Sequence, residues 1–319
     1  MIPVSLALLV AGLLFTGCQD GVAEVGGPAS LQTTEALDIL PGNAQMVGMV
    51  DLAAARASGS VGQMMKGEMS PFGQNGSGEM ERIIRLTGFD PAEDIDRVYV
   101  AAASDNESAA LVLYARFDRD RIERVIADEA PEDLERTEIE GVPAWIAAEN
   151  DGDRFAFALP NDKMMVAGSE AAVRAMLSRI STGASGASAD AELMALVEKA
   201  RHREGAWAIV RDIDGAQMNA PGDDAMGQLG GLTDAMVTSF DFADTGFALD
   251  AYVVPRSGAA ASDVADVARA AVSTMRIQAK DEPALMQALD DVEVREEGEG
   301  VRVTAFMPES LMTQARASR

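Results

Sequence analysis

The stretch that decides the predicted fold covers residues 97–117 and reads R-V-Y-V-A-A-A-S-D-N-E-S-A-A-L-V-L-Y-A-R-F. Arg97–Ala103 and Ala109–Phe117 are apolar segments rich in Val, Leu and Tyr, which is typical of β-strands. The polar residues Asp105–Ser108 between them predict a short turn. Because a short turn joins strands that run in opposite directions, we expect an antiparallel hairpin here.

A helix is expected directly after this hairpin. Asp118 is placed to accept a hydrogen bond from the first turn of a helix over residues 119–129. Ile122, Val125 and Ile126 fall on one face of that helix, so it can cover an apolar face of the strands. A hairpin covered by an amphipathic helix is therefore the predicted building unit.

Working outward, strand-like and helix-like segments alternate along the rest of the chain. The predicted strands are residues 44–52, 135–140, 143–148, 154–159, 163–167, 205–210, 235–242, 246–255, 292–296 and 301–306. The predicted helices are residues 53–66, 79–87, 170–180, 190–203, 259–280, a short one from Pro283, and 309–317. Residues 67–78 and 212–231 are rich in Gly and polar side chains and are expected to be loops.

These patterns predict the α+β class, with mainly antiparallel sheets, helices packed on one face, and two tandem similar halves. The first half is expected over residues 36–181, the linker over residues 182–189, and the second half over residues 190–319. The order of strand, loop or helix, hairpin, helix, hairpin and helix recurs in both. A true duplication and an accidental likeness of two α+β layouts both explain this recurrence.

The N-terminal residues 1–17 have the composition of a signal peptide. Ile2–Phe15 is an uninterrupted apolar run that is too short to span a bilayer comfortably, and it is followed by Cys18, the sole cysteine. Phe15-Thr16-Gly17-Cys18 resembles the lipobox of bacterial lipoproteins. The resemblance implies cleavage before Cys18, acylation of Cys18 with chains such as palmitate, and a flexible tether over residues 18–35. An ordinary signal peptide cut after Ala23 and a buried structural cysteine are the alternatives.

The same resemblance implies a place in the cell. A lipid-anchored protein of the cell envelope is expected, facing the periplasm or the surface, and Gln19 after the cysteine favours the outer membrane over the inner one. The body beyond the tether resembles uncharacterised secreted bacterial proteins built from strand–helix repeats, a likeness that transfers no function. The expected partners are the membrane, through lipid on Cys18, and a protein or an apolar ligand.

Charge and composition restrict the possible functions further. The net charge of −26 and the pI near 4.3 argue against nucleic acid as a partner, because phosphate recognition needs a basic surface. One Cys and one His leave no material for a disulfide framework, a Cys/His zinc site or a Cys–His catalytic pair. The lone histidine, His202, lies between two arginines at a predicted helix end, where a cation complements the exposed carbonyls.

No cofactor and no catalytic residue are predicted. The phosphate-binding G-x-x-x-x-G-K-[ST] motif and the G-x-S-x-G motif of hydrolases are both missing from the sequence. Among several acidic clusters, Asp151 and Asp153 are weak calcium candidates, but no complete calcium-binding loop surrounds them.

The sequence favours a non-enzymatic envelope lipoprotein with a binding or structural role, and leaves enzyme activity open. One alternative is a periplasmic carrier of lipid or another apolar ligand. Another is an envelope hydrolase that uses two facing carboxylates.

Arginine is strongly preferred over lysine. Only Lys66, Lys163, Lys199 and Lys280 are lysines among 26 basic residues. An acidic chain with few lysines suits a salt-rich habitat, in which screening weakens the repulsion between like charges. A codon bias of a GC-rich genome explains the same preference.

Overall fold

The structure is a computed structural model. It describes residues 31–58, 62, 82, 84–103, 109–129, 134–148, 154–201, 205–213, 224–243 and 246–308. Residues 29–194 form one compact unit, called the first unit here, and residues 195–319 belong to the second unit. The α+β class with antiparallel sheets is confirmed in both.

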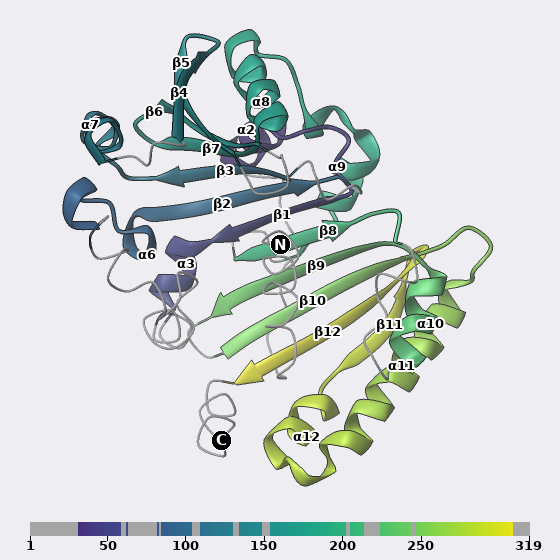
Figure 1. Ribbon diagram of the computed structural model, residues 1–319. Helices are drawn as coiled ribbons and strands as arrows, with labels where there is room; N and C mark the ends of the chain where they lie inside the picture. The colour runs from purple at the N-terminus through teal and green to yellow at the C-terminus, as the bar shows by residue number, and fades with distance from the viewer. Residues whose placement is uncertain are drawn as a thin grey trace. The chain divides into compact units, whose positions relative to one another are not determined.

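The first unit contains a sheet of seven strands among its described residues. Along the chain these are β1 (Met46–Asp51), β2 (Ile95–Ala102), β3 (Ala109–Ala115), β4 (Leu134–Ile139), β5 (Val142–Ala148), β6 (Arg154–Asn161) and β7 (Met164–Ser169). Their order in space is β1-β2-β3-β7-β6-β5-β4, and neighbours run antiparallel (Figure 1).

The helices of the first unit lie before, between and after these strands. They are α2 (Leu31–Ile39), α3 (Leu52–Ala57), α6 (Pro91–Asp94), α7 (Arg119–Glu129) and α8 (Glu170–Thr182). A further helix, α9 (Ala191–Val197), crosses the boundary between the units.

The antiparallel hairpin predicted over residues 97–117 is confirmed. Strands β2 and β3 pair with Tyr99 opposite Val112, and α7 begins and ends where the apolar spacing placed it. Asp118 Oδ1 accepts from the Arg121 N–H at 2.9 Å, as predicted for an N-cap. Long-range pairing was not predicted: β7 returns to pair with β3, and places Val166 opposite Val112.

Strand β7 approaches β3 closely at Gly168. This glycine has φ of +145°, and a Cβ there would lie 2.1 Å from the Ala109 carbonyl oxygen. Only a residue without a side chain fits both the backbone angle and the contact. Gly168 therefore permits the non-sequential pairing that completes the sheet.

Two regions differ from the predicted layout of the first unit. The predicted tether extends to residue 35, but α2 begins at Leu31 and carries the buried residues Ala36 and Leu37. The segment predicted as a linker, residues 182–189, packs inside the unit, where Ala187 is buried and its N–H donates to the Leu40 carbonyl at 2.9 Å. Short stretches of small residues resemble free linkers in sequence even when small size is what allows them to pack.

One apolar core of the first unit forms under α7. Ile122 of α7 packs with Trp145 and Leu159, and the Trp145 ring stacks on Phe157 with centroids 5.2 Å apart. Trp145 is directly opposite Phe157 in the β5–β6 ladder, so the two rings share a face of the sheet. Trp145 therefore belongs to the apolar core of the first unit.

The second unit has five described strands and three helices. The strands are β8 (Ala206–Val210), β9 (Thr233–Ala243), β10 (Gly246–Pro255), β11 (Glu293–Glu297) and β12 (Gly300–Pro308), in the order β8-β9-β10-β12-β11. The helices are α10 (Asp224–Leu232), α11 (Ala261–Gln278) and α12 (Pro283–Asp290).

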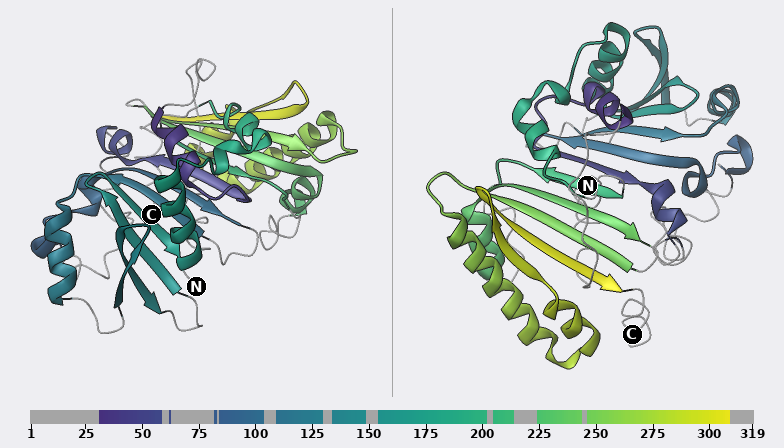
Figure 2. Two further views of the ribbon diagram at one scale, coloured as in Figure 1. Left: turned by 90° about the horizontal axis from the view of Figure 1, so that it is seen from above. Right: turned by 180° about the vertical axis from the view of Figure 1, so that it is seen from behind.

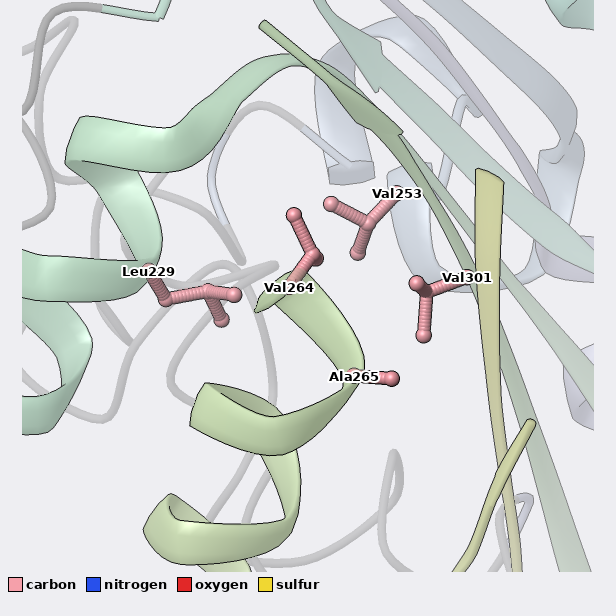
Figure 3. Packing of buried hydrophobic residues seen from close by; sticks show 5 residues of the cluster. All are labelled: Leu229, Val253, Val264, Ala265 and Val301. Atoms are coloured by element: carbon pink, nitrogen blue, oxygen red, sulfur yellow. The ribbon is translucent and has the colours of Figure 1, made fainter. Parts of the chain in front are cut away.

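In the second unit the helices cover one face of the sheet. Figure 2 shows α11 and α12 beside strands β10, β11 and β12 in both views. Leu229, Val253, Val264, Ala265 and Val301 form the cluster between the helices and the strands, and their side chains point toward one another (Figure 3). Most of helix α10 was predicted as a loop, because its Gly-rich sequence has low intrinsic helix propensity. The helix forms because packing against α11 overrides that low propensity.

The two units share a strand order. In each, three consecutive strands form an antiparallel meander, and the last strand along the chain returns to pair with the third. The first unit inserts the additional pair β4–β5 at the outer end. This matches the prediction of similar halves at the level of topology.

The outer strands β4 and β11 carry many charges. Strand β4 reads L-E-R-T-E-I, and β11 reads E-V-R-E-E. Within the described residues, no helix is long and apolar enough to span a membrane.

Candidate functional site

The first unit contains a pocket of about 500 Å³ at one end of its sheet. It is lined by Glu35, Tyr114, Asn161, Asp162, Lys163 and Met164. Tyr114 lies near the end of β3, directly opposite Met164, the first residue of β7. Residues 161–163 form the turn between β6 and β7, in which Asn161 Oδ1 accepts from the Lys163 N–H at 2.9 Å.

Helix α2 brings Glu35 to this pocket. Its Thr33 Oγ1 is hydrogen-bonded to Tyr99 Oη at 3.1 Å, and both groups are buried. The Tyr99 ring meets the Tyr114 ring edge to face, with centroids 5.8 Å apart. One hydrogen bond and one aromatic contact therefore fix α2 against the part of the sheet that carries Tyr114.

The floor of the pocket is apolar apart from one hydroxyl group. Tyr114 is 7% exposed and Met164 is 3% exposed. The Tyr114 hydroxyl has no hydrogen bond of normal geometry to any described residue. Burial and then the negative charge of nearby Glu35 raise the pKa of Tyr114, so the hydroxyl is neutral at physiological pH. A buried polar group without a partner is costly, and the pocket is where a partner can enter.

The rim carries exposed charges of both signs. Glu35, Asp162 and Lys163 are exposed, and none of them forms an ion pair with another described residue. Within the described part of the chain Lys163 has no ion-pair partner, although two carboxylates line the same pocket. The pocket therefore offers a neutral hydroxyl, two carboxylates and an ammonium, each free to contact a bound molecule.

A second cluster of charges lies in the second unit, and its charged side chains pair with one another. Arg302 and Asp250 are 3% and 2% exposed in their side chains and are hydrogen-bonded to each other. Arg302 Nε donates to Glu297 Oε1 at 2.9 Å, and Arg201 Nη2 donates to Glu297 Oε2 at 2.9 Å. The Arg302 guanidinium and the Lys199 ammonium lie 4.9 Å and 5.1 Å from the centre of the Tyr252 ring.

The pKa values in this cluster follow from its pairing. Burial alone would raise the pKa of Glu297, but the hydrogen bond and charge of Arg302, with the charges of Arg201 and Arg295, lower it overall. Burial raises the pKa of Tyr252, whose hydroxyl donates to the Glu297 carbonyl at 3.2 Å. These contacts join the chain after α9 to the β11–β12 hairpin, so the cluster is structural.

The site residues predicted from the sequence lie outside the part of the chain that the structure describes. These are the lipidation site Cys18 and the weak calcium candidates Asp151 and Asp153. In the described ranges, no group of three or more Cys, His, Asp or Glu side chains could hold a metal ion.

The pocket was not predicted from the sequence. Glu35 was placed in the tether, Asn161 and Asp162 fell between two predicted strands, and Lys163 was the first residue of the strand predicted over residues 163–167. Tyr114 was expected as an ordinary strand residue. The only sequence cue was a lysine beside an aspartate in a tight turn, because lysine is so rare in this chain.

Comparisons with known proteins add information on the fold. No family model and no curated protein matches the chain. Among solved structures, crystal form III of TP0453 is similar with a TM-score of 0.52 and 10% sequence identity, over 89% of this chain and 98% of that one. Crystal form I of TP0453 gives a TM-score of 0.48 at 10% identity, over 88% and 96% of the two chains. At this level of identity, the likeness to crystal form III shows that this chain shares the fold of TP0453.

Proposed function

We propose that this chain is a non-enzymatic lipoprotein of the cell envelope that acts by binding a small molecule in the Tyr114 pocket. The observation that carries the proposal is the Tyr114 hydroxyl, which is buried at the floor of a pocket and makes no hydrogen bond of normal geometry to a described residue. Binding pockets commonly combine an apolar floor with a few such polar groups, within volumes of about 300–1,000 Å³.

The anchor in this proposal is lipid on Cys18. Each buried methylene of an acyl chain contributes about 0.8 kcal/mol, and more than one chain is needed for stable attachment. The lipobox-like Phe15-Thr16-Gly17-Cys18 supports acylation, and Gln19 favours the outer membrane, with the body facing the periplasm or the surface.

Binding is favoured over hydrolysis by the surroundings of the two pocket carboxylates. A carboxyl group acting as general acid usually has a raised pKa, produced by dry surroundings. Glu35 and Asp162 are exposed to solvent, which is the opposite environment. The charged rim also favours a polar occupant over the wholly apolar one that a lipid carrier would hold.

Two measurements test the proposal. The parent protein should incorporate radiolabelled palmitate in bacteria and Cys18→Ser should not; an unlabelled parent would overturn the anchor. Native mass spectrometry of the protein extracted from envelopes should show a bound small molecule that is lost in Tyr114→Phe. If parent and Tyr114→Phe give the same spectrum, the pocket is not the binding site.

A further inference from the structure

We propose, on the basis of the binding function above, that the ligand of the Tyr114 pocket is a small zwitterion with a primary ammonium group at one end and an anionic group at the other. The ammonium group lies between the Tyr114 hydroxyl and the Glu35 carboxylate. The anionic group faces Lys163.

The deep end of the pocket fits a hydrogen-bond donor with positive charge. Glu35 is close enough to Tyr114 to raise its pKa, although no hydrogen bond of normal geometry joins them. An ammonium group has three N–H donors and can donate to the hydroxyl oxygen and the carboxylate together. An anion at this position would meet the negative charge of Glu35, and an apolar group would leave the buried hydroxyl unsatisfied.

The shallow end fits an anion. Lys163 is held in the tight turn after β6, and its ammonium is too far from Glu35 and Asp162 to form an ion pair with either. Asp162 adds a second carboxylate to the rim, so negative groups outnumber positive ones by two to one. A ligand with one positive end would reduce this excess, and its negative end would give Lys163 a partner.

The charge cluster of the second unit differs from the pocket in how its charges are paired. There, Arg201, Arg302, Asp250 and Glu297 pair with one another, and Lys199 lies over an aromatic ring. The pocket of the first unit holds charges of both signs that form no ion pair with any residue the structure describes. A zwitterion would complete the same kind of network in the pocket.

Calorimetry with four small probes tests the inference on the full chain in low-salt buffer, where exposed charges are least screened. Phosphoethanolamine carries both groups, ethanolamine only the ammonium, inorganic phosphate only the anion, and phosphocholine a quaternary nitrogen without an N–H donor. Phosphoethanolamine should bind at least about tenfold more tightly than each of the other three, since each lacks one contact of about 1.4 kcal/mol or more. Equal binding of ethanolamine or phosphate would overturn the zwitterion, and equal binding of phosphocholine would overturn the donor role of the ammonium.

Variants place the binding in the pocket. Tyr114→Phe, Glu35→Gln and Lys163→Gln should each weaken phosphoethanolamine binding by about tenfold. Glu192→Gln and Lys280→Gln are matched controls, because both residues are exposed and outside the pocket lining, and both should bind as the parent does. Parental affinity in all three pocket variants would overturn the assignment.

Phosphoethanolamine occurs both as a free molecule and as the headgroup of phosphatidylethanolamine. Liposome flotation distinguishes these two sources of the ligand. Unlipidated Cys18→Ser protein should float with vesicles of phosphatidylethanolamine and phosphatidylcholine, and not with phosphatidylcholine alone, if the bilayer supplies the ligand. Phosphoethanolamine binding without flotation supports a free ligand, and neither result overturns the inference. If native mass spectrometry shows a Tyr114-dependent ligand while phosphoethanolamine fails to bind, the inference of a zwitterionic ligand is refuted and the proposed binding function is retained.

Discussion

Two tyrosines of the first unit provide a matched test of how hydrogen bonding is distributed around the pocket. Tyr99 and Tyr114 are both buried, and their rings touch, but among the described residues only the Tyr99 hydroxyl has a hydrogen bond of normal geometry, to Thr33 at 3.1 Å. Replacing either tyrosine by phenylalanine removes one oxygen atom. The chemical change is the same and the expected effects on the free energy of unfolding are opposite.

Tyr99→Phe removes a buried hydrogen bond and its connection to α2. A typical hydrogen bond of this kind contributes about 1 kcal/mol, and the Thr33 oxygen loses one of its contacts as well. Tyr114→Phe removes a hydroxyl that has no such bond, so stability should stay the same or rise by up to about 1 kcal/mol. The two variants should therefore differ by about 1–2 kcal/mol, with Tyr99→Phe the less stable.

Urea unfolding followed by tryptophan fluorescence measures this difference. Trp145 belongs to the first unit and Trp207 to the second, so both variants are made in a Trp207→Phe background to report the first unit alone. At an m-value of about 2 kcal/mol/M, the midpoints should be separated by about 0.5–1 M. Equal destabilisation by both substitutions would refute the reasoning, because it would show that the Tyr114 hydroxyl already has a partner in the free protein.

Four further outcomes are expected. Arg302→Met should destabilise the second unit by about 3 kcal/mol in Trp207-monitored unfolding, because the buried Asp250 charge loses its closest partner, and adding Asp250→Leu should recover most of the loss. Because the pKa of Glu297 is lowered in the folded protein, its ionised carboxylate stabilises the fold above the ordinary pKa of about 4.5, and this stabilisation is lost as the pH falls below 4.5. In thermal melts below pH 4.5, Glu297→Gln should therefore lose less stability than the parent. Arg121→Lys should cost about 1 kcal/mol and speed amide exchange at residues 84–88, because lysine cannot contact the Leu86 and Arg85 carbonyls together. Gly168→Ala should prevent soluble expression, whereas alanine at the exposed Gly141 position, which also has positive φ but open space around it, should give folded protein with lower stability.

The extent to which the sequence predicted the fold depended on whether the signal was local. The hairpin β2–β3, the Asp118 cap with α7, and helix α8 are set by residues within a few positions of one another, and all were predicted correctly. The return of β7 to β3 joins residues more than 50 positions apart and left no local pattern.

The pocket depends on long-range packing even more than the sheet does. Its residues come from α2, the end of β3 and the β6–β7 turn, and they meet only because α2 is fixed against the tyrosine pair. Each of these residues has an ordinary local role. The chemistry of the site exists only after the long-range packing is complete, so composition and spacing could not indicate it.

The arginine preference has a structural side that the sequence did not suggest. Several arginines donate to backbone carbonyls of segments far along the chain: Arg56 to Ala92 and Ile95, Arg116 to Glu93, Arg121 to Arg85 and Leu86, Arg179 to Ile39, Arg256 to Thr233, Arg276 to Leu289, and Arg302 to Lys199. The planar guanidinium can reach two acceptors at once, which the single ammonium of lysine does less well. Arginine therefore connects elements as well as balancing charge.

The charged outer strands have a consequence for the membrane anchoring proposed above. Anchoring confines copies of a chain to a thin layer, where their local concentration can reach the millimolar range. Exposed strand edges are then the usual starting point for uncontrolled sheet extension between neighbouring molecules. Strand β4 carries Glu135, Arg136 and Glu138, and β11 carries Glu293, Arg295, Glu296 and Glu297, so a second copy docking there would have to desolvate a row of charges. Under the proposed anchoring through Cys18, this composition opposes polymerisation through the sheets of neighbouring copies.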